Sequence, residues 1–271
     1  MFDLNYRSNI SIIRSTMWKA VMILFLAFVC PASAAMTNLA QTNPATKNFD
    51  GYMLALMWIK GECSASKCNQ SINPAKLSFT IHGLWPASLD PNSGVYGPID
   101  CAKASQFSSK KYSLAVQTSL QLMWPSTTNP NEFFWKHEYE KHGSCWLPES
   151  ADLSKVPVSL KQSLATAVAN KGNSIKVQEG YFLTTFALTN VVRLEAALTA
   201  AGFPARQQPY KRADFVNAVK SATKGQRLSV ICVKNSNVVN EIRICFDKNY
   251  QPANCAKDIV DCAGKDLMFT P

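Results

Sequence analysis

The chain has 271 residues, of which 47% are hydrophobic, and a formal net charge of +10 at pH 7. That length is ample for a hydrophobic core, and the sequence contains no internal repeat, no low-complexity tract and no obvious interdomain linker. The positive charge favours polyanionic partners, although a generic basic surface would give the same value.

The first 34 residues predict a secretory signal peptide. Basic residues precede an apolar run at 21–29, and Ala-Ser-Ala at 32–34 matches the small-x-small cleavage pattern. The apolar run is too short to span a bilayer comfortably, so an uncleaved anchor is the less favoured alternative. We therefore expect a secreted or vacuolar protein, with a mature domain at 35–271 that has no further contact with the membrane.

Hydrophobic patterning predicts strands on both sides of a helical middle. Strands are expected at 52–59, 77–84, 228–234 and 241–247. Helices are expected at 111–123, 129–142, 158–170, 188–201 and 210–222. The second helix begins at Asn129-Pro130 and is stopped by Gly143. This arrangement indicates an α+β domain.

Cysteine usage is typical of a secreted protein. Cys30 lies in the signal segment, and the other cysteines are Cys63, Cys68, Cys101, Cys145, Cys232, Cys245, Cys255 and Cys262. Eight cysteines predict disulfides but allow 105 pairings, so counting alone selects none of them. Paired C-x-x-C units are absent, which argues against a structural zinc site. Asn69-Gln70-Ser71 matches an N-glycosylation acceptor.

All three histidines lie in two short motifs. F-T-I-H-G-L-W-P at 79–86 contains His82, and F-F-W-K-H-E-Y-E-K-H-G-S-C at 133–145 contains His137 and His142. Imidazole titrates near neutral pH, so histidines confined to two motifs point to proton transfer.

The second motif places several functional side chains on one helix face. At about 100° per residue, Phe134, His137, Glu138, Lys141 and His142 fall on the same side. Such a face suits a cleft better than a core; a solvated charged face is the alternative for this helix by itself.

Two other chemistries are disfavoured. The histidines of the helix are at i and i+5, whereas a zinc-protease helix needs i and i+4, and Lys141 would compete with a metal ion. Ser144 and Cys145 follow His142, but Cys145 belongs to the disulfide set and no G-x-S-x-G elbow is present. We expect no metal and no cofactor.

Phosphoryl transfer fits the residues better. One histidine could take a proton from an attacking hydroxyl and another could protonate the leaving oxygen, while a lysine stabilises charge on the phosphoryl oxygens. With an RNA 2′-hydroxyl as the nucleophile, DNA would not be a substrate.

The motifs H-G-L-W-P and W-x-H-E-x-x-K-H-G-x-C, taken together, resemble the two active-site segments of the ribonuclease T2 family. The plant secreted members, which include self-incompatibility S-ribonucleases and S-like ribonucleases, are most similar. The resemblance implies one α+β domain with a central antiparallel sheet, several helices and four disulfides. It implies endonucleolytic cleavage of single-stranded RNA through a 2′,3′-cyclic phosphate, and we expect a monomer that does not act on DNA.

The family's catalytic roles carry over to matching positions. The resemblance implies that His142 is the general base, His82 the general acid and His137 a phosphate-binding residue. Glu138 and Lys141 match the residues that stabilise the pentacovalent state.

Base-binding residues and disulfides carry over in the same way. The resemblance implies stacking of bases on Trp85 and Phe134, with Tyr96 as a weaker candidate. Ala87 and Met57 depart from the residues common at these positions in the family, which leaves base preference open. The implied disulfides are Cys63–Cys68, Cys101–Cys145, Cys232–Cys262 and Cys245–Cys255.

A non-catalytic role is the alternative function. The basic charge is similar to that of the self-incompatibility ribonucleases, so a recognition determinant, or a storage or defence protein on the same fold, is the runner-up. A lectin-like protein would leave all three histidines unexplained.

Overall fold

A computed structural model describes residues 49–65, 67–69, 72–93, 97–101, 107–128, 130–224 and 227–271. All of these belong to one compact unit, Asn43–Pro271. The expected signal peptide at 1–34 and the candidate Tyr96 lie outside the described residues.

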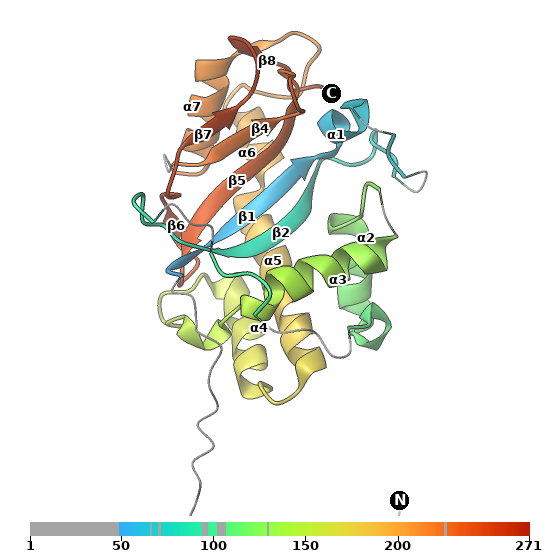
Figure 1. Cartoon of the computed structure of the whole chain (residues 1–271), viewed down its shortest axis with the longest axis vertical. Coiled ribbons are helices and arrows are strands. Elements are labelled where there is room, and N and C mark those ends of the chain that lie inside the picture. The colour runs from blue at the N-terminus through green and yellow to red at the C-terminus, as the bar shows by residue number, and fades with distance from the viewer. Residues whose placement is uncertain are drawn as a thin grey trace, which may run out of the picture. The chain divides into compact units, whose positions relative to one another are not determined.

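A six-stranded sheet runs through the described part of the chain, in the order β2-β1-β5-β4-β7 with β6 paired to β5 (Figure 1). Its strands are β1 (Gly51–Trp58), β2 (Phe79–Ala87), β4 (Ser229–Cys232), β5 (Val239–Asp247), β6 (Pro252–Ala253) and β7 (Ile259–Asp261). The pairs are antiparallel except β4 with β7. A second, two-stranded sheet pairs β3 (Tyr210–Lys211) with β8 (Asp266–Leu267). The predicted α+β fold with a central, mostly antiparallel sheet is confirmed.

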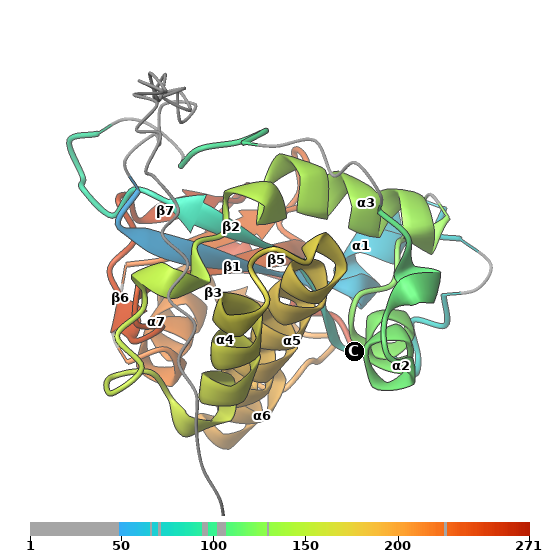
Figure 2. The ribbon, with the colours of Figure 1, turned by 90° about the horizontal axis from the view of Figure 1, so that it is seen from below.

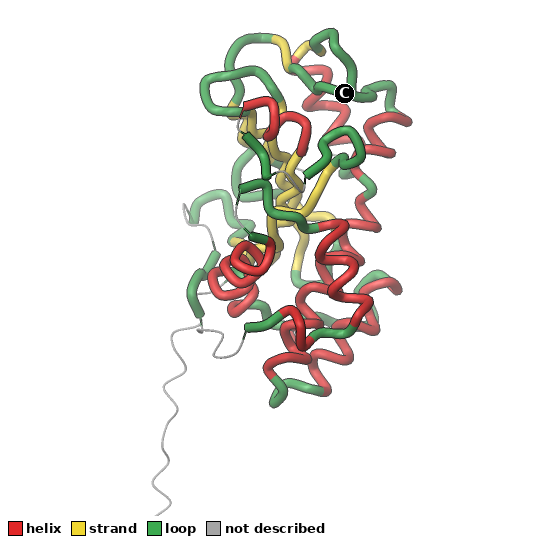
Figure 3. Tube along the Cα trace, turned by 90° about the vertical axis from the view of Figure 1, so that its right-hand side faces the viewer, coloured by secondary structure: helices red, strands yellow, loops and turns green. Residues whose placement is uncertain are grey.

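Helices lie on both sides of this sheet. They are α1 (Ile59–Ala65), α2 (Leu114–Met123), α3 (Asn131–Lys141), α4 (Val158–Ala169), α5 (Ser174–Val192), α6 (Leu194–Ala200) and α7 (Arg212–Ala222). Figure 2 shows α4, α5 and α6 on one face, and α3 on the opposite side next to β2. In Figure 3 the yellow strands run between these helical layers.

The two faces of β1 have different surroundings because successive side chains of a strand point in opposite directions. Tyr52, Leu54, Leu56 and Trp58 are buried in the main hydrophobic core, together with side chains of α5. Met53, from the other face, packs in a small cluster with residues that include Trp85. The sheet therefore uses one face for the core and leaves the other for the site.

The predicted helix at 188–201 is wrong as a single element. Arg193 adopts a left-handed conformation with φ 43°, which separates α5 from α6. The segment 174–187, which had no predicted structure, forms most of α5. The Asn173 side chain caps it by accepting a hydrogen bond from the Lys176 backbone N at 3.2 Å.

Gly180 sits inside α5 because two helices approach closely there. A Cβ at this position would lie 2.6 Å from the Ala167 Cβ of α4. Glycine therefore serves helix packing here and does not break the helix, although it weakens the helical pattern in the sequence.

Several element boundaries also differ from the predictions. The first strand ends at Trp58 and is followed by α1, which was not predicted. The second continues to Ala87, through Pro86, which β2 accommodates because it is the edge strand. Strands β3, β6, β7 and β8 have only two or three residues each, too few for a periodic pattern.

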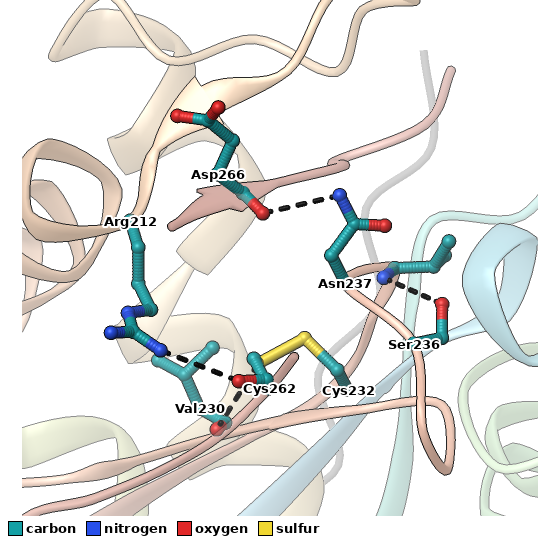
Figure 4. The surroundings of a disulfide bond; sticks show 8 residues. Arg212, Val230, Cys232, Ser236, Asn237, Cys262 and Asp266 are labelled. Atoms are coloured by element: carbon teal, nitrogen blue, oxygen red, sulfur yellow. Dashed lines mark hydrogen bonds between the residues drawn. A yellow bond between two sulfur atoms is a disulfide. The ribbon is translucent and has the colours of Figure 1, made fainter. Parts of the chain in front are cut away.

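Four disulfides form, between the same pairs that the family resemblance implied: Cys63–Cys68, Cys101–Cys145, Cys232–Cys262 and Cys245–Cys255. Figure 4 shows the third, where the Arg212 guanidinium donates to the Cys262 carbonyl at 3.3 Å. The Cys101–Cys145 bond and a hydrogen bond from Asp100 N to Lys141 O (2.8 Å) fasten the segment 97–101 to the end of α3.

Candidate active site

His82 occupies an irregularity in the edge strand. Ile81 pairs with Leu56 and Gly83 pairs with Ala55, so His82 is an extra residue between two consecutive partners. Bulges of this kind redirect a side chain and often occur beside active sites. The indole N–H of Trp124 donates to the His82 carbonyl at 2.9 Å, which satisfies the displaced backbone.

The His82 imidazole lies between two buried carboxylates. Its Nδ1 is 2.5 Å from Glu241 Oε2, and its Nε2 is 3.8 Å from Glu138 Oε1. Burial acts to lower the pKa of His82, but the hydrogen bond and charge of Glu241, with the charge of Glu138, outweigh it and raise that pKa above 6.5. The protonated ring is therefore more populated at neutral pH than in an ordinary histidine.

Helix α3 brings its predicted polar face to His82. His82 and α3 line the same cleft, which has a volume of about 350 Å³. The helix and the residue after it contribute His137, Glu138, Lys141 and His142. Phe134 is not part of the lining, but its ring centroid is 5.9 Å from that of His82. The helix face deduced from residue spacing is thus the face that meets β2.

Trp85 connects the two motifs physically. Its ring centroid is 5.1 Å from that of His82 and 5.0 Å from that of His142. Its indole N–H donates to Glu138 Oε2 at 2.9 Å. Gly83 makes this contact possible, because a Cβ there would lie 2.2 Å from Trp85 Nε1 and 2.4 Å from Glu138 Oε2.

Glu138 is 2% exposed. Burial raises the pKa of Glu138, while the charge of His82, the hydrogen bond from Trp85 and the charges of His137 and Lys141 oppose that rise. The neutral form of this carboxyl is therefore more populated than in an ordinary glutamate. A neutral carboxyl can donate a hydrogen bond.

His142 has the opposite electrostatic environment to His82. Burial, followed by the charges of Lys141, His82 and His137, lowers the pKa of His142 to about 3. Its Nδ1 is buried without a hydrogen-bond partner among the residues that the structure describes. The low pKa favours the neutral, proton-accepting imidazole.

Comparison with known proteins identifies relatives of this chain. Residues 49–255 match the Ribonuclease T2 family. The chain belongs to this family. Ribonuclease DdI of Dictyostelium discoideum is 28% identical over 246 residues, which cover 90% of each chain. Extracellular ribonuclease LE of Solanum lycopersicum is 28% identical over 183 residues, 66% of each chain.

The fold comparison agrees with the family. The crystal structure of the self-incompatibility-associated SF11-RNase of Nicotiana alata covers 83% of this chain and 100% of its own, with a TM-score of 0.59 and 21% identity. That likeness concerns the fold alone. The family and its relatives together indicate that the chain is a ribonuclease.

The remaining candidate residues of this T2-family chain have varied positions. Ala87 lines the cleft, whereas Met57 pairs with Glu241 on the neighbouring strand. Asn69 is half-buried, and its backbone N donates to Thr127 O at 2.6 Å. Gln70 and Ser71, which complete the glycosylation motif, lie outside the described residues.

Glu241 and Arg243 are site residues that were not predicted from the sequence. Both lie on β5, whose other residues are largely apolar, and their i, i+2 spacing puts them on one face of that strand. Two opposite charges on one face of the strand predicted at 241–247 were the available signal. Arg243 also lines the cleft, with its guanidinium carbon 5.2 Å from the centre of a Trp85 ring.

The described residues contain neither a metal-binding cluster nor a membrane-spanning helix. Within them, no three His, Cys, Asp or Glu side chains are grouped so as to hold a metal ion. Also within them, no helix is both long and apolar enough to cross a membrane.

Proposed function

We propose that this T2-family ribonuclease is a secreted, metal-independent endoribonuclease that cleaves single-stranded RNA by transphosphorylation. The 2′-oxygen attacks the adjacent phosphorus, the bond from phosphorus to the 5′-oxygen breaks, and a 2′,3′-cyclic phosphate and a 5′-hydroxyl result. No metal is needed because the nucleophile belongs to the substrate. DNA lacks that hydroxyl and is not cleaved.

The opposite environments of two histidines in one cleft carry this proposal. A general base must be neutral and a general acid protonated at the working pH. The low pKa of His142 suits the base that takes the 2′-hydroxyl proton, and the raised pKa of His82 suits the acid that protonates the 5′-oxygen. Divergent pKa values in a pair of titratable groups are a general guide to such roles.

Three other side chains act on the phosphoryl group. His137 and Lys141 line the same cleft, where an imidazole N–H donor and a positive charge stabilise the oxygens of the pentacovalent state as they become more negative. Glu138 lines the same cleft and, through its contacts with Trp85 and His82, holds those rings around the pentacovalent state. In the hydrolytic second step a water replaces the 5′-oxygen, so His82 and His142 exchange roles.

Bases stack on aromatic rings next to this centre. Trp85 is half-buried and lines the cleft, and because its indole N–H is engaged by Glu138, it offers its ring face and not a hydrogen bond. Phe134 is the second platform, and Tyr96 is proposed on family resemblance alone. Stacking tolerates different bases.

Secretion follows from removal of residues 1–34. The disulfides support an oxidising destination, and a relative is named as extracellular. Amino-terminal sequencing of protein recovered from culture medium should begin at Ala35; a chain that retains residue 1 would contradict cleavage. Glycosylation at Asn69 predicts a mass decrease on deglycosylation that Asn69→Gln abolishes.

Dinucleotide cleavage tests the enzymatic proposal. A ribodinucleotide incubated in EDTA should yield a 2′,3′-cyclic phosphate, and the 2′-deoxy analogue should remain intact. Full activity of His142→Ala, or cleavage of the deoxy analogue, would overturn the proposal. The complete cleft gives no reason to prefer a recognition or storage role.

A further inference from the structure

Glu241 is a charged residue inside the sheet that the catalytic roles above do not use. It lies on β5 and is 4% exposed. Both of its oxygens are engaged, Oε2 by His82 Nδ1 and Oε1 by Arg243 Nε, each at 2.5 Å. Burying an ionised carboxylate is costly unless it is paired, so this arrangement requires both partners.

The sheet leaves room for this contact across an intervening strand. β1 separates β5 from β2. In the row of paired residues next to Glu241, Arg243 of β5 lies opposite Ala55 of β1, and Ala55 lies opposite Gly83 of β2. Ala55 contributes one methyl group and Gly83 no side chain, so the longer side chains of β5 can extend over β1. The bulge at His82 brings the imidazole to meet them.

The contact determines which His82 nitrogen faces the reaction. Because Nδ1 is bound to Glu241, Nε2 is directed to the other side, where Glu138 lies 3.8 Å away on the cleft wall. A carboxylate behind an imidazole selects the tautomer and holds the ring orientation, as in a Ser-His-Asp triad.

We propose that Glu241, held in place by Arg243, is a positioning residue that fixes the His82 ring with Nε2 toward the leaving oxygen and retains the proton on it. This inference rests on the proposed role of His82 as the general acid. The charged and titratable groups that surround His82 are Glu241 and Arg243 from β5, Glu138 and Lys141 from α3, and the histidines at 137 and 142.

Two variants should shift the pKa of His82 in opposite directions. Burial of Glu241 would raise its own pKa, but hydrogen bonds and charges from His82 and Arg243 lower it, so the carboxylate is the form present. Glu241→Gln removes that negative charge, and the pKa of His82 should fall. Arg243→Met removes a positive charge that lowers the pKa of His82, and that pKa should rise.

Imidazole NMR and pH–rate profiles of the full mature protein report both shifts. The chain has only three histidines, so His82→Ala assigns the His82 signal directly. We expect Glu241→Gln to lower kcat for a ribodinucleotide about 10- to 100-fold, as when a partner that orients an imidazole is removed. KM should change little, and the basic limb should move to lower pH. Arg243→Met should move that limb to higher pH.

Glu179→Gln is the matched control. Glu179 is also a buried, paired glutamate, bound to Lys176 at 2.6 Å, and it does not line the cleft. Its replacement should leave kcat and the pH profile unchanged. If Glu241→Gln does not fold, Glu241→Asp tests the proposal, because it keeps the negative charge and withdraws the carboxylate from His82 Nδ1. Both kcat and the pKa of His82 should then fall, and an unchanged kcat and titration would overturn the positioning role.

The outcomes separate this inference from the proposed function. An unchanged His82 titration and pH profile in Glu241→Gln would overturn the positioning role, even with His82→Ala inactive. Full activity in His82→Ala would instead overturn the acid role of His82, whatever the titration shows.

Discussion

The imidazole of His82 and the carboxylate of Glu241 are 159 positions apart in the chain, yet 2.5 Å separates Nδ1 from Oε2. The contact crosses β1 and forms only when β2 and β5 have both paired with it. The site therefore has a second layer, in which the sheet holds the imidazole of the proposed general acid from behind while α3 faces it from the front.

Replacing either of the two proposed catalytic histidines should slow turnover strongly. We expect His82→Ala and His142→Ala each to lower kcat for a ribodinucleotide about 10²- to 10⁴-fold, the usual contribution of a general acid or base. Circular dichroism should show both variants folded. Native-like activity in either one would remove it from the proton-transfer scheme.

A substrate with a good leaving group distinguishes the two roles. A nucleoside 3′-(4-nitrophenyl) phosphate expels nitrophenolate, which needs no protonation. On this substrate His82→Ala should recover most of its activity, whereas His142→Ala should remain inactive because the 2′-hydroxyl still needs a base. The reverse pattern would exchange the two assignments.

The pH dependence follows from the two shifted pKa values. His142 must be neutral, which holds above its pKa of about 3, and His82 must be protonated, which holds below its raised pKa. The free-enzyme profile of kcat/KM should therefore form a plateau through acidic pH. It should fall as the pH rises through the His82 pKa above 6.5, and a profile that climbs across neutrality would contradict the account.

Gly83 should be intolerant of any side chain. A Cβ would displace Trp85 or Glu138, so Gly83→Ala should cost about 1–3 kcal/mol of unfolding free energy, as overpacking usually does, and lower kcat. Gly172→Ala is the control, because nothing lies within 4 Å of its added Cβ. Thermal unfolding and dinucleotide cleavage measure both effects; equal behaviour of the two variants would contradict the close contact.

Much of the site could be predicted from local sequence. The face shared by His137, Glu138, Lys141 and His142 follows from helical periodicity over a few turns, and α3 presents that face to the cleft. The strand that carries His82 also followed from its apolar run. These predictions needed only short-range patterns.

Other features depended on contacts that a local pattern does not contain. The bulge at His82 arises from pairing with β1, and the use of Glu241 depends on strand order. The break at Arg193 requires a left-handed conformation in a residue that ordinarily favours helix. The role of Gly180 depends on the close approach of α4 and α5, which the sequence of α5 alone does not contain.

The disulfide between Cys101 and Cys145 should matter for both stability and activity. It closes a loop of 44 residues, for which chain entropy gives about 4 kcal/mol, against about 2 kcal/mol for the five-residue separation of Cys63 and Cys68. Replacing both cysteines of one disulfide with serine, and then both of the other, allows the two losses of stability to be compared by denaturant unfolding. The Cys101–Cys145 bond ties the segment 97–101, which contributes cleft residues, to the end of α3. Only removal of this bond should therefore also raise KM.

Cleavage of single-stranded RNA in EDTA tests the central claim most directly. The mature protein, freed of metal and kept in EDTA, should retain its full rate and release products ending in a 2′,3′-cyclic phosphate. Loss of activity in EDTA that an added divalent metal restores, or products ending in 5′-phosphate, would contradict a histidine-based transphosphorylation.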